Sequence, residues 1–157
     1  MSNHRFVRHL AAPVALGLLG LFAIGCVPPP EPAPVACSEG TFNAETGNEP
    51  CTPAPPGTYV DTVGATAATF CELGTYQPDE GQTSCLVAPP GTYVDFQGAA
   101  AATDCPLGRY QPLSGQTSCL LAPLGSYVDS TGAQAATSCP PGTTTTFLGA
   151  TSQDDCE

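Results

Sequence analysis

The sequence lacks the residues on which most enzyme active sites depend. It has no Lys, and its two histidines, His4 and His9, lie in a leader-like N-terminal segment. Without His or Lys, the rest of the chain has no usual general base for a Ser or Cys nucleophile and no His-based zinc site. Its cysteines also lack the clustered C-x2–4-C pairs of a four-cysteine zinc site. We therefore expect no enzymatic activity and no cofactor.

Positive charge is scarce. Of the three Arg residues only Arg109 lies beyond residue 30, whereas all 14 Asp and Glu residues do. These 14 carboxylates and one cation give this part of the chain a net charge of about −13. Such a field repels nucleic acid and anionic lipid, so we expect no nucleic-acid partner.

Trp is absent and the only Met is the initiator, whereas Gly (17), Pro (18) and Cys (9) are abundant. This composition does not supply the long apolar segments of a single packed core. It indicates a disulfide scaffold from an oxidising compartment, in which covalent bridges replace a large core. The predicted fold class is a small disulfide-rich protein, mostly irregular with short β-hairpins, built as an elongated tandem array.

Residues 1–25 have the order of a lipoprotein signal peptide, with Arg5 and Arg8 before an apolar run from residue 10 to residue 25. This run is shorter than the ~20 residues of a spanning helix. It ends in Ala23-Ile24-Gly25-Cys26, which resembles a bacterial lipobox with Ala23 in place of the usual Leu. Cys26 is the predicted lipidation site; the alternatives are a secretory signal cut nearby and an uncleaved signal anchor.

If Cys26 is lipidated, the protein is exported across the inner membrane and anchored by acyl chains. Outer-membrane or cell-surface placement is favoured, because Val27 stands where an Asp would favour retention in the inner membrane. Residues 26–36 then comprise the lipidated cysteine and a linker with five prolines. Proline fixes φ near −65°, so we expect an extended spacer that separates the repeats from the membrane.

Residues 37–156 follow one 17-residue frame. With the first cysteine as position 0, the frame has Gly at 3, an aromatic at 5, Gly at 10 and cysteine at 14, as in Cys71–Cys85. In alternate copies both cysteines are replaced by alanine, as at Ala54 and Ala68, which produces a 34-residue period; residues 54–87 and 88–121 agree at 25 of 34 positions. A fixed period of this length indicates stacked units. The predicted modules are 37–51, 54–68, 71–85, 88–102, 105–119, 122–136 and 139–156.

The paired loss of cysteines bears on disulfide connectivity. Positions 0 and 14 lose their cysteines together, so pairing them leaves no orphan thiol. This predicts Cys37–Cys51, Cys71–Cys85 and Cys105–Cys119, with Cys139–Cys156 by elimination. The competing scheme pairs across the alanine modules as Cys51–Cys71, Cys85–Cys105 and Cys119–Cys139. The last module has Gln153 at position 14 and Thr144 in place of the aromatic, so we expect a slipped or lengthened loop there, with Phe147 a candidate for the missing ring.

Two further series recur with the frame. An aromatic every 17 residues either packs neighbouring modules together, which we favour, or forms a ligand-facing stripe; the series is Phe42, Tyr59, Tyr76, Tyr93, Tyr110 and Tyr127. Asp61, Asp95 and Asp129 recur in the alanine modules. They are weak calcium candidates, because calcium needs several oxygens close together, and a turn-capping role explains the same position.

The frame C-x-x-G-x-Y-x4-G-x-T-x-C resembles the ephrin type-A/B receptor-like cysteine-rich repeat, which is akin to modules of growth-factor and tumour necrosis factor receptors. The resemblance covers nearly all of residues 37–156. Ala54, Ala88 and Ala122 depart from it, since they stand where the family has the second cysteine of a module junction. The resemblance implies an elongated, extracellular, non-enzymatic region used in recognition or as a stalk.

The expected function is therefore that of a surface-anchored lipoprotein whose repeats mediate adhesion or recognition. Its partners would be the membrane, through the N-terminal lipid, and an extracellular protein or glycan. The alternative is a structural spacer or coat protein without a specific ligand. A patch of apolar or aromatic side chains shared by neighbouring modules would favour recognition.

Overall fold

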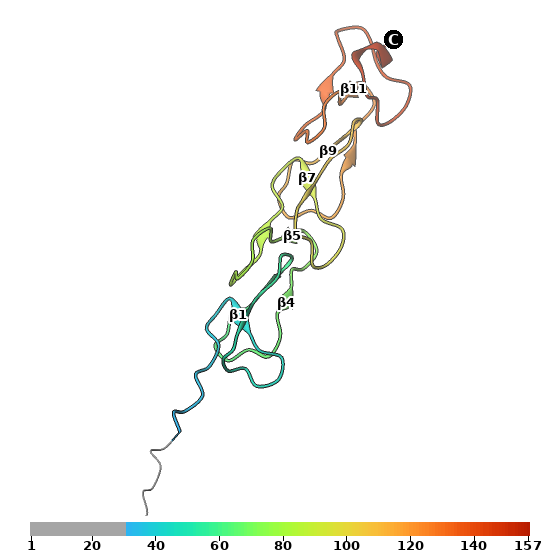
Figure 1. Ribbon diagram of the computed structural model, residues 1–157. Helices are drawn as coiled ribbons and strands as arrows, with labels where there is room; N and C mark the ends of the chain where they lie inside the picture. Colours follow the sequence, from blue (N-terminus) through green and yellow to red (C-terminus); the bar gives the residue numbers. More distant parts are fainter. Residues whose placement is uncertain (1–30) are drawn as a thin grey trace, which may run out of the picture. The chain divides into compact units, whose positions relative to one another are not determined.

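The computed structural model describes residues 31–157, which form a tandem series of antiparallel β-hairpins without an α-helix (Figure 1). This confirms the predicted fold class. Each strand has two residues. The pairs are β1 (Thr41–Phe42) with β2 (Thr52–Pro53), β3 (Thr58–Tyr59) with β4 (Thr69–Phe70), β5 (Thr75–Tyr76) with β6 (Leu86–Val87), β7 (Thr92–Tyr93) with β8 (Thr103–Asp104), β9 (Arg109–Tyr110) with β10 (Leu120–Leu121), and β11 (Ser126–Tyr127) with β12 (Thr137–Ser138).

The hairpin register is the same in these six modules. Positions 4 and 5 pair with positions 16 and 15, so Tyr76 lies opposite Leu86. The second strand thus follows the second cysteine instead of lying inside the disulfide loop. A hydroxyl residue commonly opens the first strand: the Thr75 amide and its Oγ1 both donate to the carbonyl of Glu72, at 3.0 and 2.7 Å. Such local side-chain bonds are typical of Ser and Thr at turns.

Each module docks on the next through backbone hydrogen bonds. Between modules 71–85 and 88–102, the amide of Gly74 donates to the carbonyl of Val94 (2.9 Å) and that of Gln77 to Ala99 (3.0 Å). In the reverse direction, Gly98 donates to Cys71 (2.8 Å). The same positions bond at each junction from residue 37 onward, except that the Gly125 amide at the last junction donates to a side chain. Two-residue strands would leave most backbone groups unpaired, and this docking supplies their partners.

Modules also touch the next but one, which explains a glycine of the frame. Gly74 has φ +77°, a region that L side chains rarely adopt. A Cβ built on it would overlap the carbonyl of Gly115, two modules further along. Gly57 has the same relation to Gly98. Each module therefore contacts both the adjacent module and the one that lies 34 residues further along the sequence.

The last module keeps the hairpin but with a longer loop. Cys139 and Cys156 are 17 residues apart, against 14 in the other disulfides. The three additional residues coincide with a short 3-10 helix, η1 (Gln153–Asp155), which Ser152 caps. The backbones of Thr144 and Glu157 still exchange two hydrogen bonds, both 2.9 Å. The lengthened loop is as expected.

Two details of the last module differ from expectation or from the other modules. Phe147 does not supply the missing ring, because its side chain is 49% exposed. The carbonyl that would accept from Gly125 is replaced by a side chain: the Gly125 amide donates to Thr145 Oγ1 at 3.0 Å. Thr145 is accordingly buried.

Candidate functional site

The four disulfides of the described chain close the cysteine modules. They are Cys37–Cys51, Cys71–Cys85, Cys105–Cys119 and Cys139–Cys156, with Cα–Cα distances of 5.6 to 5.8 Å. These are the pairs that the joint loss of positions 0 and 14 predicts. None of the pairs of the competing scheme occurs.

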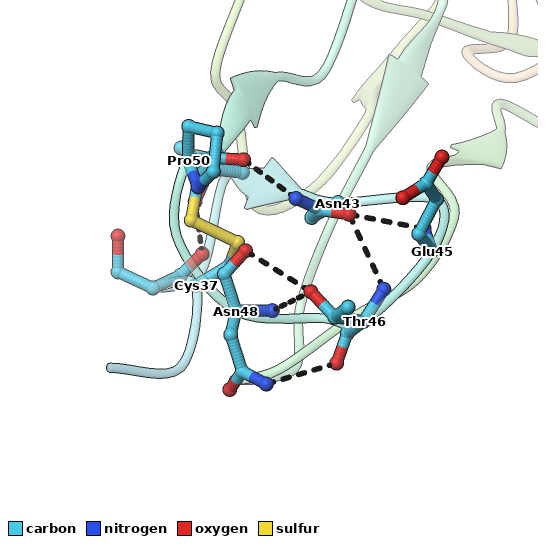
Figure 2. Close-up of a disulfide and its surroundings, with 9 residues drawn as sticks. Cys37, Asn43, Glu45, Thr46, Asn48 and Pro50 are labelled. Atoms are coloured by element: carbon cyan, nitrogen blue, oxygen red, sulfur yellow. Dashed lines mark hydrogen bonds between the residues drawn. A yellow bond between two sulfur atoms is a disulfide. The ribbon is translucent and has the colours of Figure 1, made fainter. Parts of the chain in front are cut away.

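An amide side chain at position 6 braces each of the first three disulfide loops. In module 37–51, Asn43 Nδ2 donates to the carbonyl of Pro50 (2.8 Å), and its Oδ1 accepts from the amides of Glu45 and Thr46 (Figure 2). Gln77 is almost fully buried and does the same in module 71–85, donating to Ser84 and accepting from Asp79. The loop is thus held across its width by one polar side chain beside the disulfide.

The alanine modules replace both the bridge and the brace by an apolar cluster. Position 6 is then Val60, Val94 or Val128, each only 2% exposed. In module 88–102, Val94 packs with the buried Ala88 and Ala99, and Tyr76 and Ala102 pack against this group. Position 6 therefore changes together with the cysteines. Sequence reasoning missed this alternation of Gln or Asn with Val, although it is visible in the 34-residue repeat.

The aromatic residues of the frame are neither all buried between modules nor all exposed as a ligand-facing stripe. Tyr127 is buried and forms an isolated bridge with Ala150 of the last module, and Tyr76 packs against the Val94 cluster. The others, from Phe42 to Tyr110, are half-buried. The series is thus partly buried throughout, with Tyr127 the most buried ring, and the other five keep part of their surface accessible.

Asp61, Asp95 and Asp129 do not cap turns in the described structure. All three are exposed, and their carboxylates accept no hydrogen bond from any residue of 31–157, so the turn-capping prediction was wrong. In the same residues, no group of three His, Cys, Asp or Glu side chains could hold a metal ion. No two further metal-ligating side chains of the described chain gather around any of these Asp residues.

Large apolar side chains are exposed on several second strands. Phe70 in β4 is 64% exposed and Val87 in β6 is 58% exposed; Leu86, Leu120 and Leu121 are exposed as well. Where position 16 is apolar, part of the side chain covers the position-10 glycine two modules further on. A Cβ on Gly98 would lie 2.8 Å from Phe70 Cδ1, and one on Gly149 would lie 2.8 Å from Leu121 Cδ2.

The predicted signal peptide, the lipidation site Cys26 and the start of the proline linker lie outside the described residues. Residues 31–36 are the described part of the linker; 31–35 have no regular secondary structure, and Ala36 forms an isolated antiparallel bridge with Asn48. The structure from residue 31 to residue 157 contains no helix long and apolar enough to cross a bilayer.

These features define the class of protein: tandem, disulfide-closed hairpin modules of the extracellular type, with almost no helix. A family model described as tyrosine-protein kinase ephrin type A/B receptor-like matches residues 68–105, 91–139 and 123–156. The chain belongs to this family. The matched segments overlap, as expected for a frame that repeats throughout them. No curated protein matches the chain.

Proposed function

We propose that the protein is a lipid-anchored surface lipoprotein whose repeats mediate adhesion or recognition of an extracellular protein or glycan, without enzymatic activity. Its family consists of cysteine-rich repeats of extracellular recognition type. The lipobox-like sequence that ends at Cys26 supports the anchor, with outer-membrane or surface placement. The proline-rich segment that follows would hold the repeats away from the lipid.

The exposed apolar side chains of the second strands carry the recognition half of the proposal. Phe70, Val87 and Leu121 keep much of their apolar surface exposed even though each covers a position-10 glycine two modules further on. Exposed apolar surface on soluble proteins commonly marks an interaction site where it is contiguous. Position 16 also accepts a polar residue without change of frame, because it is Asp104 in module 88–102. The apolar residues at the other copies are therefore not required by the hairpin.

The test is surface crosslinking and pull-down with the membrane-anchored protein and its Phe70→Asp variant. The substitution places at position 16 the residue that module 88–102 carries there, so the fold should be kept. We expect a reproducible partner with the unchanged protein and about tenfold lower recovery with the variant, since loss of an apolar interface anchor costs about 1–2 kcal/mol. No reproducible partner would favour the spacer, whereas a partner recovered equally with the variant would show that Phe70 does not carry the recognition.

The same preparation tests the anchor. Metabolic labelling with a fatty-acid analogue should place label on the N-terminal peptide that begins at Cys26. Label at no residue of that peptide would overturn lipid anchoring without bearing on recognition.

A further inference from the structure

A small pocket lies at the junction of modules 88–102 and 105–119. Its volume is about 210 Å³, and its walls include Tyr93 and Asp95 from the alanine module and Pro106, Arg109, Thr117 and Ser118 from the cysteine module. This is below the ~300–1,000 Å³ of typical sites for drug-sized molecules. The pocket therefore suits one ring-sized group instead of an extended ligand.

Arg109 places a cation in this pocket, opposite in sign to the Asp95 carboxylate that also lines it. One guanidinium nitrogen, Nη1, donates to the carbonyl of Cys119 at 3.0 Å, which holds the side chain against the loop. A carbonyl does not neutralise the charge, and no carboxylate of residues 31–157 forms an ion pair with Arg109. A guanidinium has five N–H donors, so most of them stay free for an anion.

The equivalent junction one period earlier shows what is special here. Modules 54–68 and 71–85 have the same Tyr, Asp, Thr and Ser at the corresponding wall positions: Tyr59, Asp61, Thr83 and Ser84. Only two of the wall residues named above differ. Thr75 stands in place of Arg109, and Glu72 stands in place of Pro106. Both differences make the later junction more positive: Arg109 offsets the charge of Asp95 there, whereas the earlier junction has Asp61 and Glu72 with no cation.

The other walls restrict which anion fits. Asp95 repels a group with several negative charges but accepts hydrogen bonds from ligand hydroxyls, and Thr117 and Ser118 offer further hydroxyls. Tyr93 adds an aromatic surface suited to the C–H face of a sugar ring. A single carboxylate beside several hydroxyls on one ring is the chemistry that meets all of these groups. Guanidinium binds carboxylate with two parallel hydrogen bonds.

We propose that this pocket binds an acidic sugar residue of a glycan, with its carboxylate on Arg109 and its hydroxyls on Asp95, Thr117 and Ser118. This deepens the proposed recognition function and rests on it. Phe70, in β4, is not among the walls of the pocket, so the two experiments test different surfaces.

The experiment is a titration of the isotope-labelled protein in detergent micelles, followed by amide chemical shifts. The probes are methyl β-D-glucuronide, the neutral methyl β-D-glucoside, and acetate. We expect saturable shifts at Tyr93, Arg109 and Thr117 with the glucuronide, and about tenfold weaker binding of the glucoside and of acetate, because each lacks one of the two recognised groups. Acetate binding as tightly as the glucuronide would mean recognition of a bare carboxylate, such as a peptide end, and would overturn the proposal.

The matched variant is Arg109→Thr, which restores the residue of the sister junction. It should abolish glucuronide binding while all four disulfides still form. Conversely, Glu72→Pro with Thr75→Arg should create a second glucuronide site at Tyr59. Asp95→Asn should weaken glucuronide binding and strengthen acetate binding. Unchanged glucuronide affinity in Arg109→Thr would overturn the site, and it would leave the crosslinking result with Phe70→Asp unaffected.

Discussion

Replacing Gly74 by Ala is expected to lower the free energy of unfolding by about 2–5 kcal/mol. An L side chain in the left-handed region costs about 1–2 kcal/mol, and overpacking adds about 1–3 kcal/mol. The second cost arises because the new Cβ would overlap the carbonyl of Gly115, which belongs to the cysteine module two places along. Chemical denaturation with the disulfides intact measures the change.

Gly142→Ala is the matched control. Gly142 stands at the same frame position with φ +89°, but beyond its two chain neighbours no heavy atom of the described chain lies within 4 Å of a Cβ built there. It should therefore lose only the conformational part, about 1–2 kcal/mol. Equal losses at the two positions would show that the contact between next-but-one modules contributes nothing to stability.

Converting a cysteine module into an alanine module should cost less than simply deleting its disulfide. Cys71→Ala with Cys85→Ala removes a constraint worth about 3 kcal/mol for a loop of this length. It also leaves the buried amide of Gln77 beside two methyl groups. Adding Gln77→Val reproduces the set Ala88, Val94 and Ala102 of the next module. Burying that Val should return about 1–2 kcal/mol.

The expected order of stability is therefore unchanged protein, then triple variant, then double variant, measured by denaturation after mass spectrometry confirms the other three disulfides. If the triple variant is less stable than the double variant, position 6 does not act together with the cysteines. The Gln77 hydrogen bonds would then be independent of the bridge. The free energy of unfolding of the triple variant, compared with that of the unchanged protein, would also measure how much less stable an alanine module is than a disulfide-closed one.

The module frame could be predicted from sequence because it depends on local chemistry. Because the cysteines at positions 0 and 14 are replaced by alanine together, they are predicted to pair with each other. Glycines at fixed positions predict turns. The docking could not be predicted in the same way. The glycine at position 74 indicates a positive φ. The sequence does not indicate that the carbonyl oxygen of Gly115, 41 residues later, occupies the space where a Cβ would be.

The candidate sites were predictable only in part. Asp95 recurs in a series and attracted attention for that reason, yet its series has no shared role in the described structure. Arg109 was noted from sequence only as the sole cation beyond residue 30. Its importance became visible only when the structure placed it in a pocket with Tyr93 and Asp95. Likewise, Phe147 is the aromatic residue of the last module, but it stands at frame position 8 instead of 5 and is 49% exposed.

Amide hydrogen exchange tests most directly whether the modules form one docked stack. The amide of Gly74 donates to Val94 of the next module and that of Gly108 donates to Val128, both at 2.9 Å, whereas the amide of Gly142 at the same frame position has no acceptor within the described residues. The stack predicts slow exchange at Gly74 and Gly108 and fast exchange at Gly142, since protection follows hydrogen bonds that open only when modules separate. Exchange at Gly74 and Gly108 as fast as at Gly142 would contradict it, and would mean that the modules are independent loops on a flexible chain.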